Sequence, residues 1–186
     1  RDRSPSRGLG DVYKRQQAHC VFPTPEEFEL MSRRKKLWVA HCPQSNMNAN
    51  GVAAPIRRYL DAGIHVGLGT DIAGSNTLSM FRTISDTIVA SKIYWNSMER
   101  KGDPFAEKTY LTVSEAFYLA TKGGCSFWGK AGSFEEGSLF DAVVIDDAPL
   151  WDFNNRSLRQ RIERVVFQGD ERHTVAKFIN GRKVYG

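Results

Sequence analysis

Residues 64–71 read IHVGLGTD, an apolar run of the buried-strand type that ends in a threonine and an aspartate. Upstream, residues 53–62 place Ile, Tyr and Leu at helical spacing, and Gly63 is a favourable residue just past a helix end. Downstream, residues 77–95 trace one apolar helical face. A strand between two helices is the repeating unit of a parallel α/β fold, so this stretch predicts that fold class.

The same alternation continues towards the N-terminus. Residues 37–40 form a second apolar run, which ends at His41. Before it, Thr24, Pro25 and Glu27 have the spacing of a capping box with proline in the first turn, which predicts a short helix to about Ser32. We expect polar loops at residues 42–51 and 96–109, the second of them a mobile excursion.

The C-terminal part is predicted to be richer in strands. Residues 112–122 read as a helix, with Thr112 and Glu115 in capping-box spacing. After Gly123-Gly124, residues 140–146 read as a strand, and residues 175–185 read as a hairpin that turns at Asn-Gly.

Composition excludes several classes of protein. The chain has 186 residues, of which 41% are hydrophobic and 25% charged, so a disordered tail, a collagen-like repeat and a coiled coil are excluded. No apolar run is long enough for a membrane-spanning helix, and no secretory signal is recognisable. Three cysteines without C-x-x-C spacing argue against a disulfide framework and a zinc finger. We therefore expect a cytoplasmic protein with reduced thiols.

The net charge of +5 is concentrated at the start of the chain. Residues 1–16 hold five Lys/Arg and two Asp, and their mixture of Arg, Ser, Pro and Gly cannot bury an apolar face. The segment resembles read-through of a sequencing adaptor, so we expect it to be non-native and the native chain to begin at about Gln17. The alternative is a basic arm that binds nucleic-acid phosphates.

Polar residues follow three successive predicted strands: His19, His41 and Asp71. In parallel α/β barrels the chemistry lies at the carboxyl ends of the strands. Imidazole and carboxylate suit zinc; Asp71 could bind the metal and accept a proton, and His19 could hydrogen-bond developing charge. Taken singly, each has a plain structural explanation, such as a helix cap; together, they favour one polar site.

Other histidines and cysteines receive structural interpretations. His65 lies within a predicted strand and His173 in a charged loop. Cys20 and Cys42 directly follow His19 and His41, and because successive strand side chains point to opposite faces, we expect both to be packing thiols.

The ordered motifs resemble the metal-dependent amidohydrolase superfamily and, within it, the guanine deaminases. The likeness covers nearly all of residues 17–186. It rests on AHC at 18–20, HCPQSN at 41–46, GLGTDIAG at 67–74, LSM at 78–80, AFYLATKGG at 116–124, GSFEEG at 132–137 and FDAVVI at 140–145.

This resemblance implies a (β/α)8 TIM-type barrel beside a small β-sandwich. Residues 17–124 would supply about strands six to eight of the barrel, and residues 125–186 the C-terminal strands of the sandwich. Asp71 would be the metal ligand and a catalytic group, and His19 a catalytic and substrate-binding histidine. His41 would shape the floor of the site. The implied cofactor is Zn²⁺, with Fe²⁺ as the alternative.

The implied reaction is hydrolysis of guanine to xanthine and ammonia by a homodimeric enzyme that binds neither nucleic acid nor membrane. The sequence has no His-x-His pair and lacks the family's further His ligand and its proton-shuttling Glu. We therefore expect an inactive C-terminal fragment of a deaminase. The alternatives are an amidohydrolase acting on another purine, a pyrimidine or a triazine, and a non-catalytic basic module that binds nucleic acid.

Overall fold

Three parallel strands organise the N-terminal half of the computed structural model, which describes residues 14–102, 109–150 and 152–186. They pair in the order β1-β2-β3, with Trp38 opposite both Gln16 and His65. The predicted strands at 37–40 and 64–69 are confirmed. The strands are β1 (Arg15–Ala18), β2 (Leu37–His41) and β3 (His65–Leu68).

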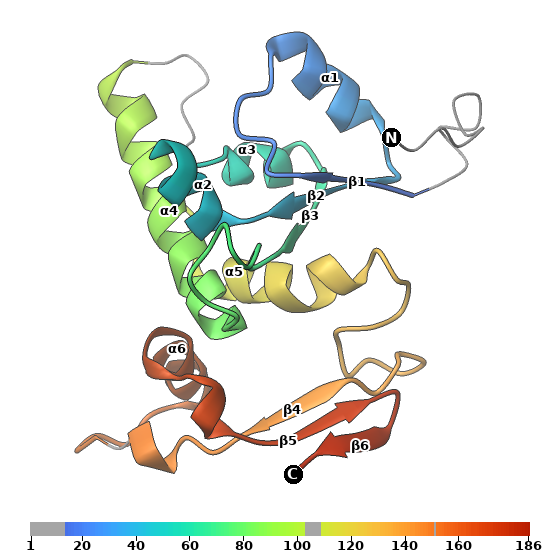
Figure 1. Ribbon diagram of the computed structural model, residues 1–186, viewed down its shortest axis with the longest axis vertical. Coiled ribbons are helices and arrows are strands. Elements are labelled where there is room, and N and C mark those ends of the chain that lie inside the picture. The colour runs from blue at the N-terminus through green and yellow to red at the C-terminus, as the bar shows by residue number, and fades with distance from the viewer. Residues whose placement is uncertain (1–13, 103–108, 151) are drawn as a thin grey trace.

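Helices α1 (Pro25–Arg33) and α3 (Ile56–Asp61) cover one face of this sheet (Figure 1). The predicted capping box of Thr24 and Glu27 opens α1. Helix α3 begins later than the predicted residue 53, because the residue before a proline, here Pro55, avoids helical geometry. Their contacts with the strands form the main core, whose fully buried members include Val39, Ile56, Tyr59 and Val66.

The polar loop expected at residues 42–51 is wrong, because most of it is helix α2 (Pro43–Asn50). Pro43 lies in the first turn, where its missing N–H costs no hydrogen bond. Gly51 closes the helix in the left-handed conformation and donates its N–H to the Met47 carbonyl. The helix carries almost no apolar periodicity, so pattern alone did not reveal it.

Helix α4 (Met80–Arg100) is the longest in the molecule and is offset from the predicted 77–95. It begins after Thr77 and Ser79, whose hydroxyls accept the N–H groups of Ser79 and Arg82 and so cap the first turn. Its extension to Arg100 overturns the first part of the expected excursion at 96–109. Residues 103–108 of that excursion lie outside the described residues.

Helix α5 (Val113–Tyr118) begins with the predicted capping box and continues as a π-helical turn, η2 (Leu119–Gly123). This segment lies on the opposite side of the sheet from α1 and α3 (Figure 1). Backbone meets backbone here, because a Cβ added to Gly67 would lie 2.8 Å from the Gly124 Cα. Glycine at position 67 therefore allows the end of η2 to lie directly against β3.

A second, antiparallel sheet occupies the C-terminal part and contains β4 (Ala142–Ile145), β5 (Thr174–Ile179) and β6 (Arg182–Tyr185). Both the predicted strand and the predicted hairpin are confirmed. Asn180 and Gly181 take positive φ angles of 48° and 76°, as a tight hairpin turn of this type requires. Short 3₁₀ turns, η3 (Ala148–Leu150) and η4 (Glu171–His173), flank the connection between β4 and β5.

Helix α6 (Leu158–Gln168) lies between β4 and β5 in sequence and was not predicted. Its capping box, Ser157 with Gln160, is legible in the sequence and could have revealed it. Val166 of this helix joins a second core cluster with Ile84 and Ile88 of α4 and Ala116 of α5. The cluster ties the C-terminal part to the helices beside the parallel sheet.

The described portion contains no helix with the combined length and apolar character needed to cross a membrane. Of the segment predicted to be non-native, residues 1–13 lie outside the described residues, whereas Arg15 and Gln16 pair with Leu37 and Trp38.

Candidate active site

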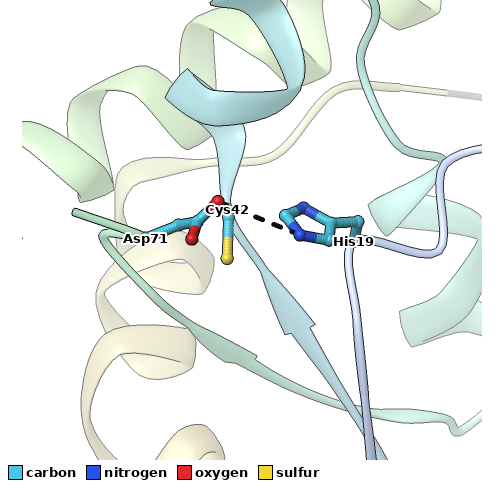
Figure 2. A group of neighbouring side chains, drawn as sticks. All are labelled: His19, Cys42 and Asp71. Carbon is cyan, nitrogen blue, oxygen red and sulfur yellow. Dashed lines mark ion pairs between the residues drawn. The ribbon is translucent and has the colours of Figure 1, made fainter. Parts of the chain in front are cut away.

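Three side chains with metal-binding chemistry meet at the carboxyl ends of the parallel strands. His19 follows β1, Cys42 lies between β2 and α2, and Asp71 follows β3; their candidate ligand atoms all lie within 4.8 Å of one another. Figure 2 shows the His19 ring and the Asp71 carboxylate facing each other, with His19 Nε2 3.9 Å from Asp71 Oδ2. The structure thus brings together two of the three residues that the sequence singled out.

Strand alternation predicted that the His41 side chain faces the site and that the Cys42 side chain packs on the opposite side. In the structure, Cys42 joins the group with His19 and Asp71, and His41 does not. Strand β2 ends at His41, and Cys42 adopts φ −120° and ψ 80°, so its side chain leaves the alternating pattern and joins His19 and Asp71. Cys42 is buried, as expected of a packing thiol, but its side chain lies beside His19 and Asp71 instead of on the opposite side. Cys20, by contrast, lies against the core, as expected.

His41, the last residue of β2, is only 1% exposed and lies near His19. Neither of its ring nitrogens has a hydrogen-bond partner among the described residues. Burial, reinforced by the nearby His19, lowers the pKa of His41 to about 3. His41 is therefore a neutral buried ring at physiological pH.

The backbone around the site is left-handed at several non-glycine residues. The φ angles are 66° at His19, 45° at Cys20, 51° at Asp71 and 81° at Ala73. Only Asn180, in the hairpin turn, shares this feature among the other described non-glycine residues. Such conformations are costly and cluster at functional sites, so they support the assignment independently of residue type.

Two buried residues that sequence reasoning did not select hold His19 in place. Asn46, on α2, places Oδ1 2.8 Å from His19 Nδ1. Tyr59, on α3, donates its hydroxyl to the Cys20 carbonyl at 2.5 Å and so fixes the left-handed turn. The helical periodicity of residues 53–62 marked Tyr59 only as core, and the missed α2 hid Asn46.

Close packing also positions Asp71. A Cβ added to Gly74 would lie 2.7 Å from Asp71 Oδ2 and 3.0 Å from the Ser45 Cβ. The backbone N–H of Ser75 donates to the Asp71 carbonyl at 2.8 Å, which closes the turn. Glycine at position 74 therefore leaves the room that the carboxylate occupies.

The remaining histidines have the structural roles expected of them. His65 stacks on Trp38 with ring centroids 4.5 Å apart, and its Nε2 lies 3.2 Å from the Lys35 carbonyl. The buried ring of His173 accepts the Asp170 N–H as part of a helix cap. Neither ring joins the candidate site.

The donor set of the site fits zinc. Imidazole nitrogen, carboxylate oxygen and thiolate sulfur are all ligands of this ion. Burial and the Asp71 carboxylate raise the pKa of the Cys42 thiol to about 11. Without a bound metal ion, this thiol therefore remains protonated at neutral pH. The side chains of His19 and Asp71 are 43% and 40% exposed, so both donors are accessible, whereas Cys42 is buried.

Strands alternating with helices, with polar side chains at the carboxyl ends of the parallel strands, define a protein of the α/β class whose candidate site lies at one edge of the sheet. The family model "Amidohydrolase family" matches residues 2–184, and the chain belongs to that family. The matched range includes residues 2–16, and the non-native origin of the segment 1–16 stays a prediction.

Guanine deaminases are among its most similar relatives. The guanine deaminase of Dictyostelium discoideum is 33% identical over 174 residues, which cover 90% of this chain and 37% of that protein. A crystal structure of guanine deaminase from C. acetobutylicum with bound guanine superposes with a TM-score of 0.85 and 39% identity, covering 96% of this chain and 41% of its own.

A third similar structure is atrazine chlorohydrolase from Arthrobacter aurescens in complex with zinc. It is 25% identical to this chain and has a TM-score of 0.70. The match covers 91% of this chain and 36% of the chlorohydrolase chain. The chain therefore spans about two fifths, or less, of the length of these relatives.

Proposed function

We propose that this chain is part of a zinc-dependent hydrolytic deaminase that converts guanine to xanthine and ammonia. The observation that carries the proposal is the superposition on a guanine deaminase holding guanine, at a TM-score of 0.85 over 96% of this chain. The left-handed turns that bring His19 and Asp71 together add support from this chain alone.

The proposal includes a place in the larger fold. The parallel sheet would form about strands six to eight of a (β/α)8 barrel within residues 17–124, and β4, β5 and β6 would form a share of a small β-sandwich within residues 125–186. The parallel pairing of β1, β2 and β3 in one sheet and the antiparallel pairing of β4, β5 and β6 in the other support this division.

Asp71 would hold the metal, with Zn²⁺ favoured and Fe²⁺ the alternative; Cys42 and His19 lie near enough to contribute donors. A bound zinc ion lowers the pKa of water towards neutrality. The zinc in the related atrazine chlorohydrolase structure supports this choice of metal.

This chain's own residues would manage the protons. In the overall reaction a C–O bond to water forms, the C–N bond to the exocyclic amine breaks, and the amine leaves as ammonia. The second Asp71 oxygen would accept a proton from the water, and His19 Nε2, 3.9 Å from Asp71 Oδ2, would hydrogen-bond the reacting purine. His41 would shape the floor of the site.

An amidohydrolase acting on a triazine or another nucleobase is the second candidate, and the similarity to atrazine chlorohydrolase favours it specifically. Family membership favours either enzyme over the nucleic-acid-binding hypothesis. A homodimer follows from the family resemblance, and the free thiols Cys20, Cys42 and Cys125 support a cytoplasmic location.

The test is a substrate comparison on the protein encoded by the complete reading frame that contains this sequence. We expect xanthine from guanine at a higher kcat/KM than for adenine, cytosine or triazine substrates. Asp71→Asn should abolish turnover and reduce bound zinc, whereas Asp61→Asn, at an exposed carboxylate, should change neither. Preferential hydrolysis of another substrate would overturn the guanine assignment.

The 186-residue chain should form no xanthine, because its sequence lacks the His-x-His pair, the further His ligand and the proton-shuttling Glu that the family resemblance implies. Turnover of guanine by this chain at a rate similar to that of the longer protein would contradict the expected division of the active site.

A further inference from the structure

Helix α2 contacts two loops of the candidate site through polar side chains: the loop that contains His19 and the loop that follows Asp71. Gln44 accepts the Asn76 N–H at 2.9 Å, and Asn48 donates to the Gly74 carbonyl at 3.2 Å, so both contact the loop that follows Asp71. Asn46, between them in sequence, contacts His19 instead. One helix therefore holds the two sides of the site in register.

Asn46 makes the contact that bears on chemistry. Its side chain is only 4% exposed, and its Oδ1 lies 2.8 Å from His19 Nδ1. A carboxamide oxygen can only accept a hydrogen bond, so the ring nitrogen facing it must carry the hydrogen. In a neutral imidazole, the other nitrogen then has the free lone pair.

We infer that Asn46 is a positioning residue that fixes His19 as the Nδ1–H tautomer. Nε2, which faces Asp71 at 3.9 Å, is then the ring nitrogen that presents its free lone pair within the site. Tyr59 complements this by holding the backbone, because it binds the carbonyl of the next residue, Cys20. The catalytic meaning of the tautomer rests on the proposed function, but the tautomer itself does not.

Long-range ¹H–¹⁵N correlation spectra of the 186-residue chain, without metal and at about pH 9, report the tautomer of each neutral histidine. We expect a protonated-type Nδ1 and an unprotonated-type Nε2 at His19. The opposite pattern in the unmodified chain would overturn the inference without any variant. His65 and His173 provide internal reporters of folding in the same spectrum.

Matched variants separate positioning from general structure. Asn46→Leu removes the acceptor at similar volume and should yield a mixture of His19 tautomers. Asn46→Asp, which presents only acceptors when ionised, should retain the Nδ1–H form. Asn48→Leu, on the same helix but in contact with the other loop, should also retain it. An unchanged tautomer in a folded Asn46→Leu chain would refute the role of Asn46.

In the complete enzyme, Asn46→Leu should lower kcat about ten- to a hundredfold, as expected for residues that orient a catalytic group, with a smaller change in KM. The two proposals fail separately. A changed tautomer in an enzyme that ignores guanine would refute the substrate alone, and an unchanged tautomer in a working guanine deaminase would refute the positioning role alone.

Discussion

The backbone of the candidate site is left-handed at four residues: His19, Cys20, Asp71 and Ala73. This conformation turns the side chains of His19 and Asp71 towards each other, in directions that ordinary strand ends would not give them. An L-residue in this conformation costs about 1–2 kcal/mol, although Asp and His tolerate it better than Ala. Hydrogen bonds from Tyr59 to Cys20 and from Ser75 to Asp71 help to offset the cost. The site is therefore held by its surroundings against local preference.

Replacing Ala73 with glycine should stabilise the chain. Its φ of 81° favours glycine, so we expect the free energy of unfolding to rise by about 0.5–1 kcal/mol after the entropy of the unfolded chain is counted. Urea denaturation measures the change. Ala49→Gly, at an exposed position of α2, is the matched control and should lower stability by about 0.5–1 kcal/mol. A similar loss from both substitutions would contradict the strain at residue 73.

Gly74→Ala should impair the metal site more than the fold. The new methyl group would lie 2.7 Å from Asp71 Oδ2 and displace the carboxylate. In the complete enzyme, we expect zinc affinity to fall about tenfold or more, measured by metal competition with a chelator. Gly69→Ala, which approaches the Cys42 Sγ at 3.2 Å, is the comparison and should have the smaller effect. If the zinc affinity of Gly74→Ala were undiminished, the assignment of Asp71 to the metal site would be contradicted.

The sequence predicted which strand ends carry the site but not which side chain each presents. His19 and Asp71 were found because a polar residue directly follows an apolar run. Whether His41 or Cys42 faces the site depends on the residue at which β2 ends, and strand boundaries are poorly defined by pattern. Asn46 and Tyr59 act through contacts between elements, which no local pattern encodes.

Among the elements, those with strong end signals were predictable. The capping boxes of α1 and α5 and the Asn-Gly turn all formed as expected. Helix α2 escaped because its residues are polar and its helicity depends on Pro43 at one end and Gly51 at the other. The helix that carries Asn46 was therefore missed for want of apolar periodicity, although the residues at its two ends favour it.

An ion pair joins α3 to α5, and it predicts acid sensitivity. Arg57 Nη2 lies 2.6 Å from Glu115 Oε2, and this hydrogen bond, assisted by Thr112, lowers the pKa of Glu115 to about 2. The pair therefore stabilises the fold fully above the ordinary carboxyl pKa of about 4.5, and the contribution disappears as the pH falls from there towards 2.

Glu115→Gln should lower the free energy of unfolding by about 1–2 kcal/mol at pH 7, since the side chain is partly exposed. The difference from the unmodified chain should shrink as the pH falls towards 2. Urea titrations at several pH values measure it. Glu29→Gln breaks an exposed ion pair with Arg33 and should cost under about 0.5 kcal/mol. A difference for Glu115→Gln that does not change with pH would exclude the ion pair as its cause.

Across the whole molecule, helices α4, α5 and α6 join the two sheets. Their shared core contains Ile84, Ile88, Ala116 and Val166, all nearly or fully buried. The fold class and the strand-rich C-terminal part were predictable from patterning, but this junction was not, because α6 was missed. Its apolar contacts predict that both sheets unfold together.

Val166→Ala tests that coupling. Removing two buried methyl groups should lower stability by about 1–3 kcal/mol. Resonances of Val39 and Val66 report on the parallel sheet and resonances of the 174–185 hairpin on the antiparallel one, and both should shift to the same lower urea midpoint. Leu158→Ala, at a 69% exposed position of the same helix, should leave both nearly unchanged. Separate midpoints in Val166→Ala would show two independent units.

The contact between Gly67 and Gly124 has a consequence for sequence drift. Gly67 is the constrained partner, because an added Gly67 Cβ would lie 2.8 Å from the Gly124 Cα, whereas a Cβ added to Gly124 would lie 3.4 Å from the Gly67 Cα, an ordinary contact distance. A substitution at Gly67 should push Gly124 and the end of η2 away from β3, whereas a substitution at Gly124 meets less resistance at this contact. Relatives should therefore keep glycine at position 67 more strictly than at position 124.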